Sequence, residues 1–288
     1  CHSFDLEGYS FSPGVHYVGD LGEGGQLRGV FEGLGVAADL SFYEIDPDAY
    51  DQIHVGPDFR FDVPRGREAH ADRLAERFPR DAEGLRRVLG LFHSIGQEIG
   101  RFAGDEGASM EWFRRPPDLF RHGLRPLSKV VEEHVKDKTA QAVVYAIAGN
   151  HGMAPDRCPT AVHAAVANHY FGGAYYPKGG ARAIPKAFIK ELRRNGGEIR
   201  VGCSVERILV ERGRAIGVRL ADGTEITATD VISNADPHAT AALLPEGALP
   251  WKWRLRLPRT RYSSSAMSIF LAADLDPRQH GITSGNVW

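Results

Sequence analysis

The stretch that decides the fold is YYPKGGARAIPKAFIKELRRNGG, Tyr175–Gly197. It places a Pro-Lys-Gly-Gly turn directly before a segment with Pro185 in its first turn and apolar residues at helical spacing. The run Asn195–Gly197 ends that segment as glycine commonly ends a helix. Helix N-termini bind phosphates, but the sequence has neither the spacing G-x-x-x-x-G-K-[ST] nor a G-x-G-x-x-G between a strand and a helix. We therefore predict a turn and a helix here, and no phosphate cradle.

The residues after this helix have the pattern of short strands. Turns at Glu211–Arg214 and Ala221–Thr224 contain the residues that hairpins require. We predict a strand, a three-stranded meander and a return strand, formed by EIRVG (198–202), VERILVE (205–211), AIGVRLA (215–221) and EITATDVIS (225–233).

The residues before Tyr175 divide into a loop, a hairpin and a helical region. A glycine-containing loop, Phe11–Asp20, leads into a short helix that stops at Gly35. Alternating apolar residues around Gly56–Asp58 predict a hairpin with one buried face. From about Glu68 to Phe171 the pattern is helical, and its clearest helix starts at Asp81 as a plausible N-cap.

Composition restricts the class of protein. The chain has 288 residues, 42% of them hydrophobic, with a net charge of -2 and a pI of about 6.7, so it has no general attraction for nucleic acid. Its apolar runs are far shorter than the ~20 residues that span a bilayer. Three scattered cysteines indicate a reducing compartment, so we expect a cytoplasmic protein that can lie peripheral to a membrane. Because it starts at Cys1 and stops at Trp288 without any signal, we expect a fragment of a longer protein.

Two segments invite functional interpretations. His163 and His169 are six residues apart, about 240° around a helix, and Cys158 is badly phased with His163. We therefore expect no metal site, and ordinary histidines on a helix surface. In Trp251–Tyr262 apolar and basic residues alternate, which fits docking on an anionic lipid surface or on nucleic acid. We favour a strand or connector with one buried face, and lipid over nucleic acid as the alternative.

Several motifs, taken in order, resemble one family. They are FSPGVHYVGD (11–20), YYPKGGARAIP (175–185), NGGEIRVGCSVERILV (195–210), AIGVRLADGTEI (215–226) and DVISNADP (230–237). This pattern is similar to the FAD-dependent group that includes carotenoid isomerases, retinol saturases and bacterial phytoene desaturases, and His16-Tyr17 is most like the retinol saturase branch. The part from the helix through the meander is shared with a wider flavoprotein class that includes amine oxidases.

The resemblance implies an α/β fold, in which a three-layer FAD-binding domain lacks its first dinucleotide-binding unit and accompanies an α+β substrate domain. The implied domains are 1–20, the end of an FAD-domain segment near the flavin; 21–172, the substrate domain; 173–245, an FAD-domain helix and meander; and 246–288, a return to the substrate domain.

The implied function is that of an FAD-dependent desaturase, saturase or isomerase acting on a carotenoid, retinoid or similar isoprenoid polyene. The cofactor is FAD, with NAD(P) left open as an electron partner. Two alternatives stay open: an amine-oxidase-like flavoprotein, and a non-catalytic prenyl-binding protein of the GDP-dissociation-inhibitor type.

The resemblance also implies site residues. The Pro-Lys-Gly-Gly turn brings the chain back into the FAD domain, and Lys178 is expected to be a solvated turn lysine. The hairpin and residues 68–171 should wall a long apolar tunnel for the polyene. The expected catalytic residues are His16 and Tyr17, and the expected cofactor-binding residues are Gly14, Val205, Ser233, Asn234 and Ala235.

Overall fold

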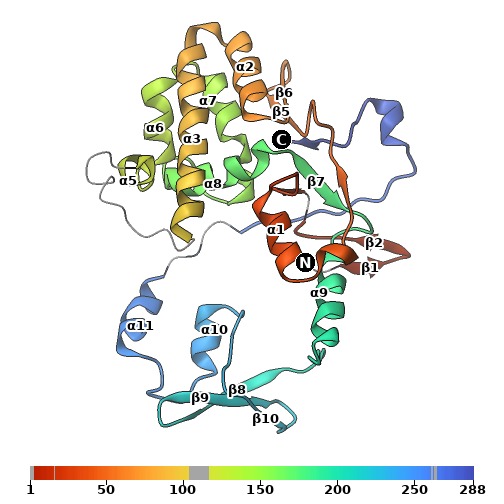
Figure 1. Ribbon diagram of the computed structural model, residues 1–288, viewed down its shortest axis with the longest axis vertical. Helices are drawn as coiled ribbons and strands as arrows, with labels where there is room; N and C mark the ends of the chain where they lie inside the picture. Colours follow the sequence, from red (N-terminus) through yellow and green to blue (C-terminus); the bar gives the residue numbers. More distant parts are fainter. Residues whose placement is uncertain (1–2, 16, 104–116, 261, 263–264) are drawn as a thin grey trace. The chain divides into compact units, whose positions relative to one another are not determined.

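The computed structural model describes residues 3–15, 17–103, 117–260, 262 and 265–288 (Figure 1). The chain forms two compact units: Cys1–Asn195 together with Ser264–Trp288, and Gly196–Ser263. The domain boundaries implied by the resemblance stay predictions.

The described residues of unit 1 form three small sheets. The predicted hairpin is confirmed: β5 and β6 pair antiparallel, and β11 joins β5 in parallel. A second sheet has the order β3-β7-β4, and β1 pairs with β2. The strands are β1 Phe4–Leu6, β2 Tyr9–Phe11, β3 Val18–Gly19, β4 Phe42–Glu44, β5 Asp51–Val55, β6 Phe59–Val63, β7 Ala174–Pro177 and β11 Asn286–Val287.

The predicted helical region is confirmed in the described residues and forms the core of unit 1. The long helix α3 stands among α2, α5, α6 and α8 (Figure 1). Its residues Leu85, Val88, Phe92 and Ile95 are almost completely buried because they recur at helical spacing on the side that faces those neighbours. The helices are α1 Gln26–Gly33, α2 Arg67–Arg77, α3 Ala82–Ala103, α5 Asp118–His122, α6 Leu127–His134, α7 Lys138–Tyr145, α8 Thr160–Phe171 and α9 Ala183–Arg194.

The Pro-Lys-Gly-Gly turn connects β7 to α9, as predicted. Gly179 and Gly180 have φ of +86° and +77°, a left-handed conformation that costs little only for glycine. The Gly180 N–H donates to Pro177 O at 3.0 Å and closes the turn. Lys178 is exposed, with its Nζ 4.7 Å from the centre of the Tyr43 ring. The glycines therefore serve the backbone turn.

Unit 2 is built on the predicted meander, with strand order β10-β9-β8. The two flanking strands were predicted wrongly, because residues 198–202 and 230–233 form no strand. Val201 is 86% exposed and Ile232 is 95% exposed, so neither segment has the neighbouring strand that a β-ladder requires. The elements are β8 Val205–Glu211, β9 Arg214–Leu220, β10 Glu225–Thr227, α10 Pro237–Ala242 and α11 Trp251–Arg256.

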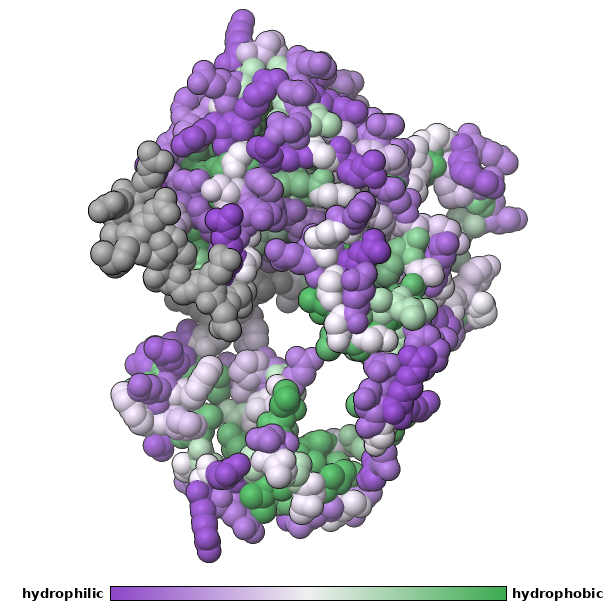
Figure 2. Space-filling model, in the orientation of Figure 1, coloured by the Kyte–Doolittle hydropathy of each residue, from purple (hydrophilic) through white to green (hydrophobic). Residues whose placement is uncertain are grey.

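The segment Trp251–Tyr262 was also predicted wrongly as a strand or connector with a buried face. Residues 251–256 form α11, whose first turn closes when the Trp253 and Arg254 amides donate to Pro250 O. Trp251 and Trp253 are 61% and 55% exposed, and apolar surface is visible on this unit in Figure 2. In the described residues of both units, none of the helices has the length and hydrophobicity needed to cross a membrane.

Candidate functional site

A buried polar cluster in unit 1 joins three residues that are distant in sequence. The Tyr17 hydroxyl donates to Asp51 Oδ2 at 3.2 Å, and Asn150 Nδ2 donates to the same hydroxyl oxygen at 2.8 Å. Tyr17 is 5% exposed and Asp51 is completely buried. The hydrogen bonds therefore run in one direction, from Asn150 through Tyr17 to the Asp51 carboxylate.

The three side chains of the cluster come from different elements of unit 1, and the position of each follows from its element. Asp51 is the first residue of β5, two positions before the buried Ile53, so strand alternation turns it to the same inner face. Asn150 ends a 3₁₀ turn that follows α7. The Tyr17 ring stacks on that of Tyr170 in α8, with centroids 4.3 Å apart. The cluster thus sits where β5, α8 and the segment before β3 meet.

Close approach of β3 to α8 depends on Gly19. A Cβ at this position would lie 2.2 Å from the backbone oxygen of His169, which is far inside van der Waals contact. The Gly19 N–H donates to His169 Nε2 at 2.9 Å. Glycine at this position therefore allows the segment that carries Tyr17 to lie against α8.

Burial shapes the electrostatics of the cluster. It raises the pKa of Asp51 to about 6, although hydrogen bonds from Trp288, Tyr17 and Asn286 act in the opposite direction. Burial, and then the Asp51 charge, raise the pKa of Tyr17 far above its ordinary value, and the same causes raise that of Tyr170 to about 12. In the part of the chain that the structure describes, no basic side chain forms an ion pair with Asp51. Both tyrosines are therefore neutral at physiological pH, and Asp51 titrates near pH 6.

The predicted site residues are distributed over both units. Tyr17 lies in the buried cluster, whereas His16 lies outside the described residues. Gly14 has φ of +84° and open space where a Cβ would be. In unit 2 Val205 begins β8 and is 36% exposed, in contrast to the buried Ile208, and residues 233–235 are exposed.

Sequence reasoning missed Asp51 and Asn150. The signal for Asp51 was available, because a carboxylate at an inward position of an alternating strand is rarely buried without a role. Asn150 carried no comparable signal, since it lies in an irregular turn. Its Oδ1 is buried and has no hydrogen-bond partner among the described residues.

The histidines of residues 151–169 differ from the prediction of helix-surface side chains. His163 is completely buried, and its Nε2 lies 3.0 Å from Val144 O, so that nitrogen must carry the proton. Its Nδ1 then accepts from His151 Nε2 at 3.0 Å. Burial lowers the pKa of His163 to about 3, with the neighbouring His151 acting in the same direction. His163 is thus a neutral core residue, and no group of three possible metal ligands occurs in the described ranges.

The apolar pocket that the hairpin and helices of unit 1 line in the described residues is not the expected long tunnel. The hairpin and helices enclose an apolar cavity of only about 30 Å³, lined by residues such as Tyr50, Phe92 and Tyr170. Its walls interdigitate because Leu89 and Phe92 of α3 and Val143 of α7 belong to one packed core. The segments expected to wall a tunnel therefore fill their own interior.

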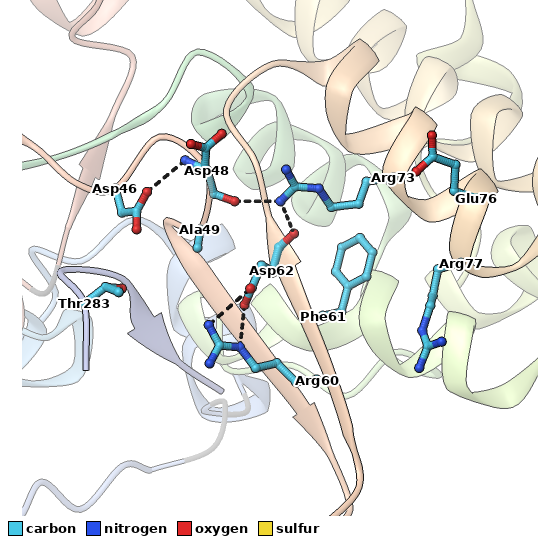
Figure 3. Close-up of a pocket in the computed structure, with 10 residues that line it drawn as sticks. All are labelled: Asp46, Asp48, Ala49, Arg60, Phe61, Asp62, Arg73, Glu76, Arg77 and Thr283. Carbon is cyan, nitrogen blue, oxygen red and sulfur yellow. Dashed lines mark hydrogen bonds and ion pairs between the residues drawn. The ribbon is translucent and has the colours of Figure 1, made fainter. Parts of the chain in front are cut away.

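A larger groove on the outer face of the hairpin is charged (Figure 3). It has a volume of about 670 Å³ and carries charges of both signs. Arg73 Nη1 donates to the backbone oxygens of Asp48 and Asp62 at 2.6 and 2.9 Å, and Arg60 pairs with Asp62 at 2.7 Å. The Arg73 hydrogen bonds hold α2 to the hairpin, and the groove offers an apolar polyene no matching surface.

Comparison with known proteins places the chain in a family. The family model described as flavin containing amine oxidoreductase matches residues 1–285. The chain belongs to this family. Membership implies a flavin cofactor, and it confirms the resemblance found in the sequence.

Two curated relatives and one solved structure define the likeness. All-trans-retinol 13,14-reductase of Danio rerio is 28% identical, and the match covers 99% of this chain and 50% of the reductase. Prolycopene isomerase of Daucus carota is 26% identical and covers 86% of this chain and 42% of its own. An oxidoreductase from Methanosarcina mazei has a TM-score of 0.60 at 19% identity, over 89% of this chain and 55% of its own.

These comparisons confirm the predicted fold class, α/β with a partial FAD-binding domain. The chain spans about half the length of the curated relatives it matches. The residues expected near the flavin fit such a group, because Gly14 borders open space and residues 233–235 are exposed. A flat aromatic cofactor needs both close backbone approach and accessible hydrogen-bonding groups.

Proposed function

We propose that the chain is part of an FAD-dependent oxidoreductase that desaturates, saturates or isomerises a carotenoid, retinoid or similar isoprenoid polyene. The observation that carries this proposal is the likeness over 99% of the chain to a retinol reductase. It is supported by a carotenoid isomerase among the relatives and by family membership over residues 1–285.

Within this proposal the chain's own residues have separate tasks. Tyr17 exchanges a proton with the substrate, and His16 is the second titratable group of the same segment. Gly14 lets the backbone approach the flavin ring. Val205 lies beside the adenine, and residues 233–235 lie near the dinucleotide. When bound, FAD supplies the hydride chemistry, and NAD(P) is the proposed electron partner.

The function is tested with the full-length protein. It should be yellow from its bound flavin, and it should change all-trans-retinol or a carotenoid when supplied with NAD(P)H or under oxidising conditions. Chromatography with mass detection separates the three reactions, because saturation adds two hydrogen atoms, desaturation removes two and isomerisation changes only retention. Oxidation of a primary amine with release of peroxide, and no change in any polyene, would replace this function by that of an amine oxidase.

Val205 provides a test of cofactor placement. Proline at this position removes a backbone N–H, so Val205→Pro in the full-length protein should weaken FAD retention during gel filtration. Val210→Pro, later in the same strand, is the matched control for damage to β8. Equal loss of flavin in both variants would count against a specific contact at Val205.

We also propose that α11 gives the protein a peripheral membrane contact. Its tryptophans are exposed, and Lys252, Arg254 and Arg256 accompany them. Aromatic and basic side chains together favour an anionic lipid surface. The full-length protein should sediment with phosphatidylserine vesicles, and a variant with Trp251→Ser and Trp253→Ser should stay in the supernatant. Equal sedimentation of both proteins would remove α11 from this role.

A further inference from the structure

The Asp51 carboxyl group accepts a hydrogen bond from the Tyr17 hydroxyl. The direction of the hydrogen bonds restricts where Tyr17 can transfer its proton. A tyrosine hydroxyl has one hydrogen. In the cluster this hydrogen is donated to Asp51 Oδ2, while the oxygen accepts from Asn150. With Asp51 ionised, Tyr17 can release its proton elsewhere only by placing a phenolate beside a buried carboxylate.

We propose that Asp51 is the proton reservoir of the site, which reloads Tyr17 when the substrate takes the tyrosine proton. This inference rests on the proposed function and deepens it. In the saturating direction, the Tyr17 O–H bond breaks and its proton goes to the substrate carbon next to the one that takes up a hydride; a bound reduced flavin would supply that hydride. The Asp51 O–H bond then breaks, its proton goes to the Tyr17 oxygen, and the electron pair stays on the carboxylate. In desaturation the same two protons move in the opposite direction.

The surroundings of Asp51 fit a group that holds and releases a proton. Its inner-face neighbours are Tyr50 before β5, Tyr17 before β3 and Tyr170 in α8, and all three phenols have a raised pKa. Two uncharged side chains come from β11 and the residue after it: Asn286, whose Nδ2 lies 3.4 Å from Asp51 Oδ1, and Trp288. On β6, Val63 pairs in register with Asp51.

The charged groups of the hairpin lie on its other face. Asp62 pairs in register with Gln52, and its carboxylate binds Arg60 in the outer groove (Figure 3). Arg73 is occupied by backbone oxygens there. The titration of Asp51 is therefore governed by burial and by neutral hydrogen-bond donors, and it falls near pH 6.

The first experiment measures the pH dependence of turnover in the full-length protein. In the saturating direction kcat should fall as the pH rises through about 6, and in the desaturating direction it should rise. Asp51→Asn should remove this ionisation and lower kcat at the favourable pH at least tenfold, with little change in KM. The matched control is Asp62→Asn, on the outer face of the same hairpin, which should keep the parental profile.

His16 needs a separate variant, because imidazole titrates in the same pH range. His16→Gln should retain the ionisation near pH 6. Retention of that ionisation in Asp51→Asn, together with its loss in His16→Gln, would assign the proton to His16 and overturn the proposal.

A second measurement needs no substrate. Infrared difference spectra between pH 5 and pH 7 should show a protonated carboxyl band that is absent from Asp51→Asn. In Tyr17→Phe its midpoint should move to higher pH, because the carboxylate loses a hydrogen-bond donor. An unmoved midpoint would overturn the coupling. A moved midpoint in a protein that changes no polyene would contradict the proposed function and leave the coupling standing.

Discussion

The buried carboxyl group of Asp51 affects both the proposed chemistry of unit 1 and its stability. Asp51 is buried without a cationic partner in the described residues, and it is held by neutral donors. Such a carboxyl group favours its protonated form, because burial disfavours the charge. Asp51, which we propose as the proton reservoir for Tyr17, therefore also links the stability of the chain to pH.

Asp51→Asn should change this linkage. Burial raises the folded-state pKa from 3.8 to about 6, so the folded chain binds the Asp51 proton more tightly than the unfolded chain does. The resulting stabilisation is complete below the unfolded pKa and is lost as the pH rises through the folded one. Between pH 5 and pH 7.5 the free energy of unfolding of the parent should fall by about 1.4 kcal/mol relative to that of Asp51→Asn. Urea unfolding at both pH values measures it, and a constant difference would contradict burial of the carboxyl group.

Gly19 tests the close approach of β3 to α8. A methyl group in Gly19→Ala would collide with the backbone oxygen of His169, so we expect a loss of roughly 2–3 kcal/mol in unfolding free energy. Gly29→Ala in α1 is the control, since no atom lies within 4 Å of its added Cβ and alanine favours a helix by ~1 kcal/mol. Thermal unfolding should therefore move in opposite directions in the two variants.

At the scale of elements, α3 organises unit 1, and its N-terminal end is tied to the connection between α6 and α7. Asp81 was predicted as an N-cap of this helix. Its two carboxylate oxygens accept from the backbone N–H groups of Lys136 and Asp137, at 2.9 and 2.7 Å. Asp137 in turn caps α7 by accepting from the Thr139 and Ala140 amides. One buried carboxylate therefore supports the geometry of three helices.

Asp81→Ala should destabilise the protein by about 2 kcal/mol, because two backbone donors lose their acceptors in a largely buried place. Asp72→Ala serves as the control: its ion pair with Arg86 has 60% of the aspartate side chain exposed, and such pairs contribute at most ~1 kcal/mol. Chemical denaturation of both variants provides the measurement. Equal losses would show that Asp81 acts only as a surface charge.

At the scale of the whole molecule, the two units differ in how much they bury. Unit 1 contains the large core around α3, whereas the buried apolar side chains of unit 2 are Ile208, Leu220 and Leu257 among the described residues. Apolar residues such as Ile232 and Val201 are instead exposed there. Burial of apolar surface is the main source of stability, so the units should differ in local stability.

Hydrogen exchange of the 288-residue chain should show this difference. The amides of α3 should be the slowest to exchange, and those of β8, β9 and β10 should exchange at least tenfold faster, because fewer buried contacts must break to open them. The amides at the two ends of α3 and at the ends of each strand are left out of the comparison. Equal protection in both units would mean that unit 2 is covered by contacts beyond its own core.

The sequence by itself determined the elements that depend on local pattern. Periodicity was enough for α3, alternation for the hairpin β5–β6, and two glycines with positive φ for the turn before α9. Motifs spread along the chain also identified the family. These features need no knowledge of distant contacts.

Tertiary structure decided what depends on partners far away in the chain. Residues 198–202 have the composition of a strand and no strand to pair with, and the alternation in 251–256 is too short to exclude the helix that formed. The Tyr17–Asp51 and Tyr17–Asn150 hydrogen bonds join residues 34 and 133 positions apart. Only folding brings such groups together, because burial and hydrogen-bond geometry are properties of the packed chain and not of any local pattern.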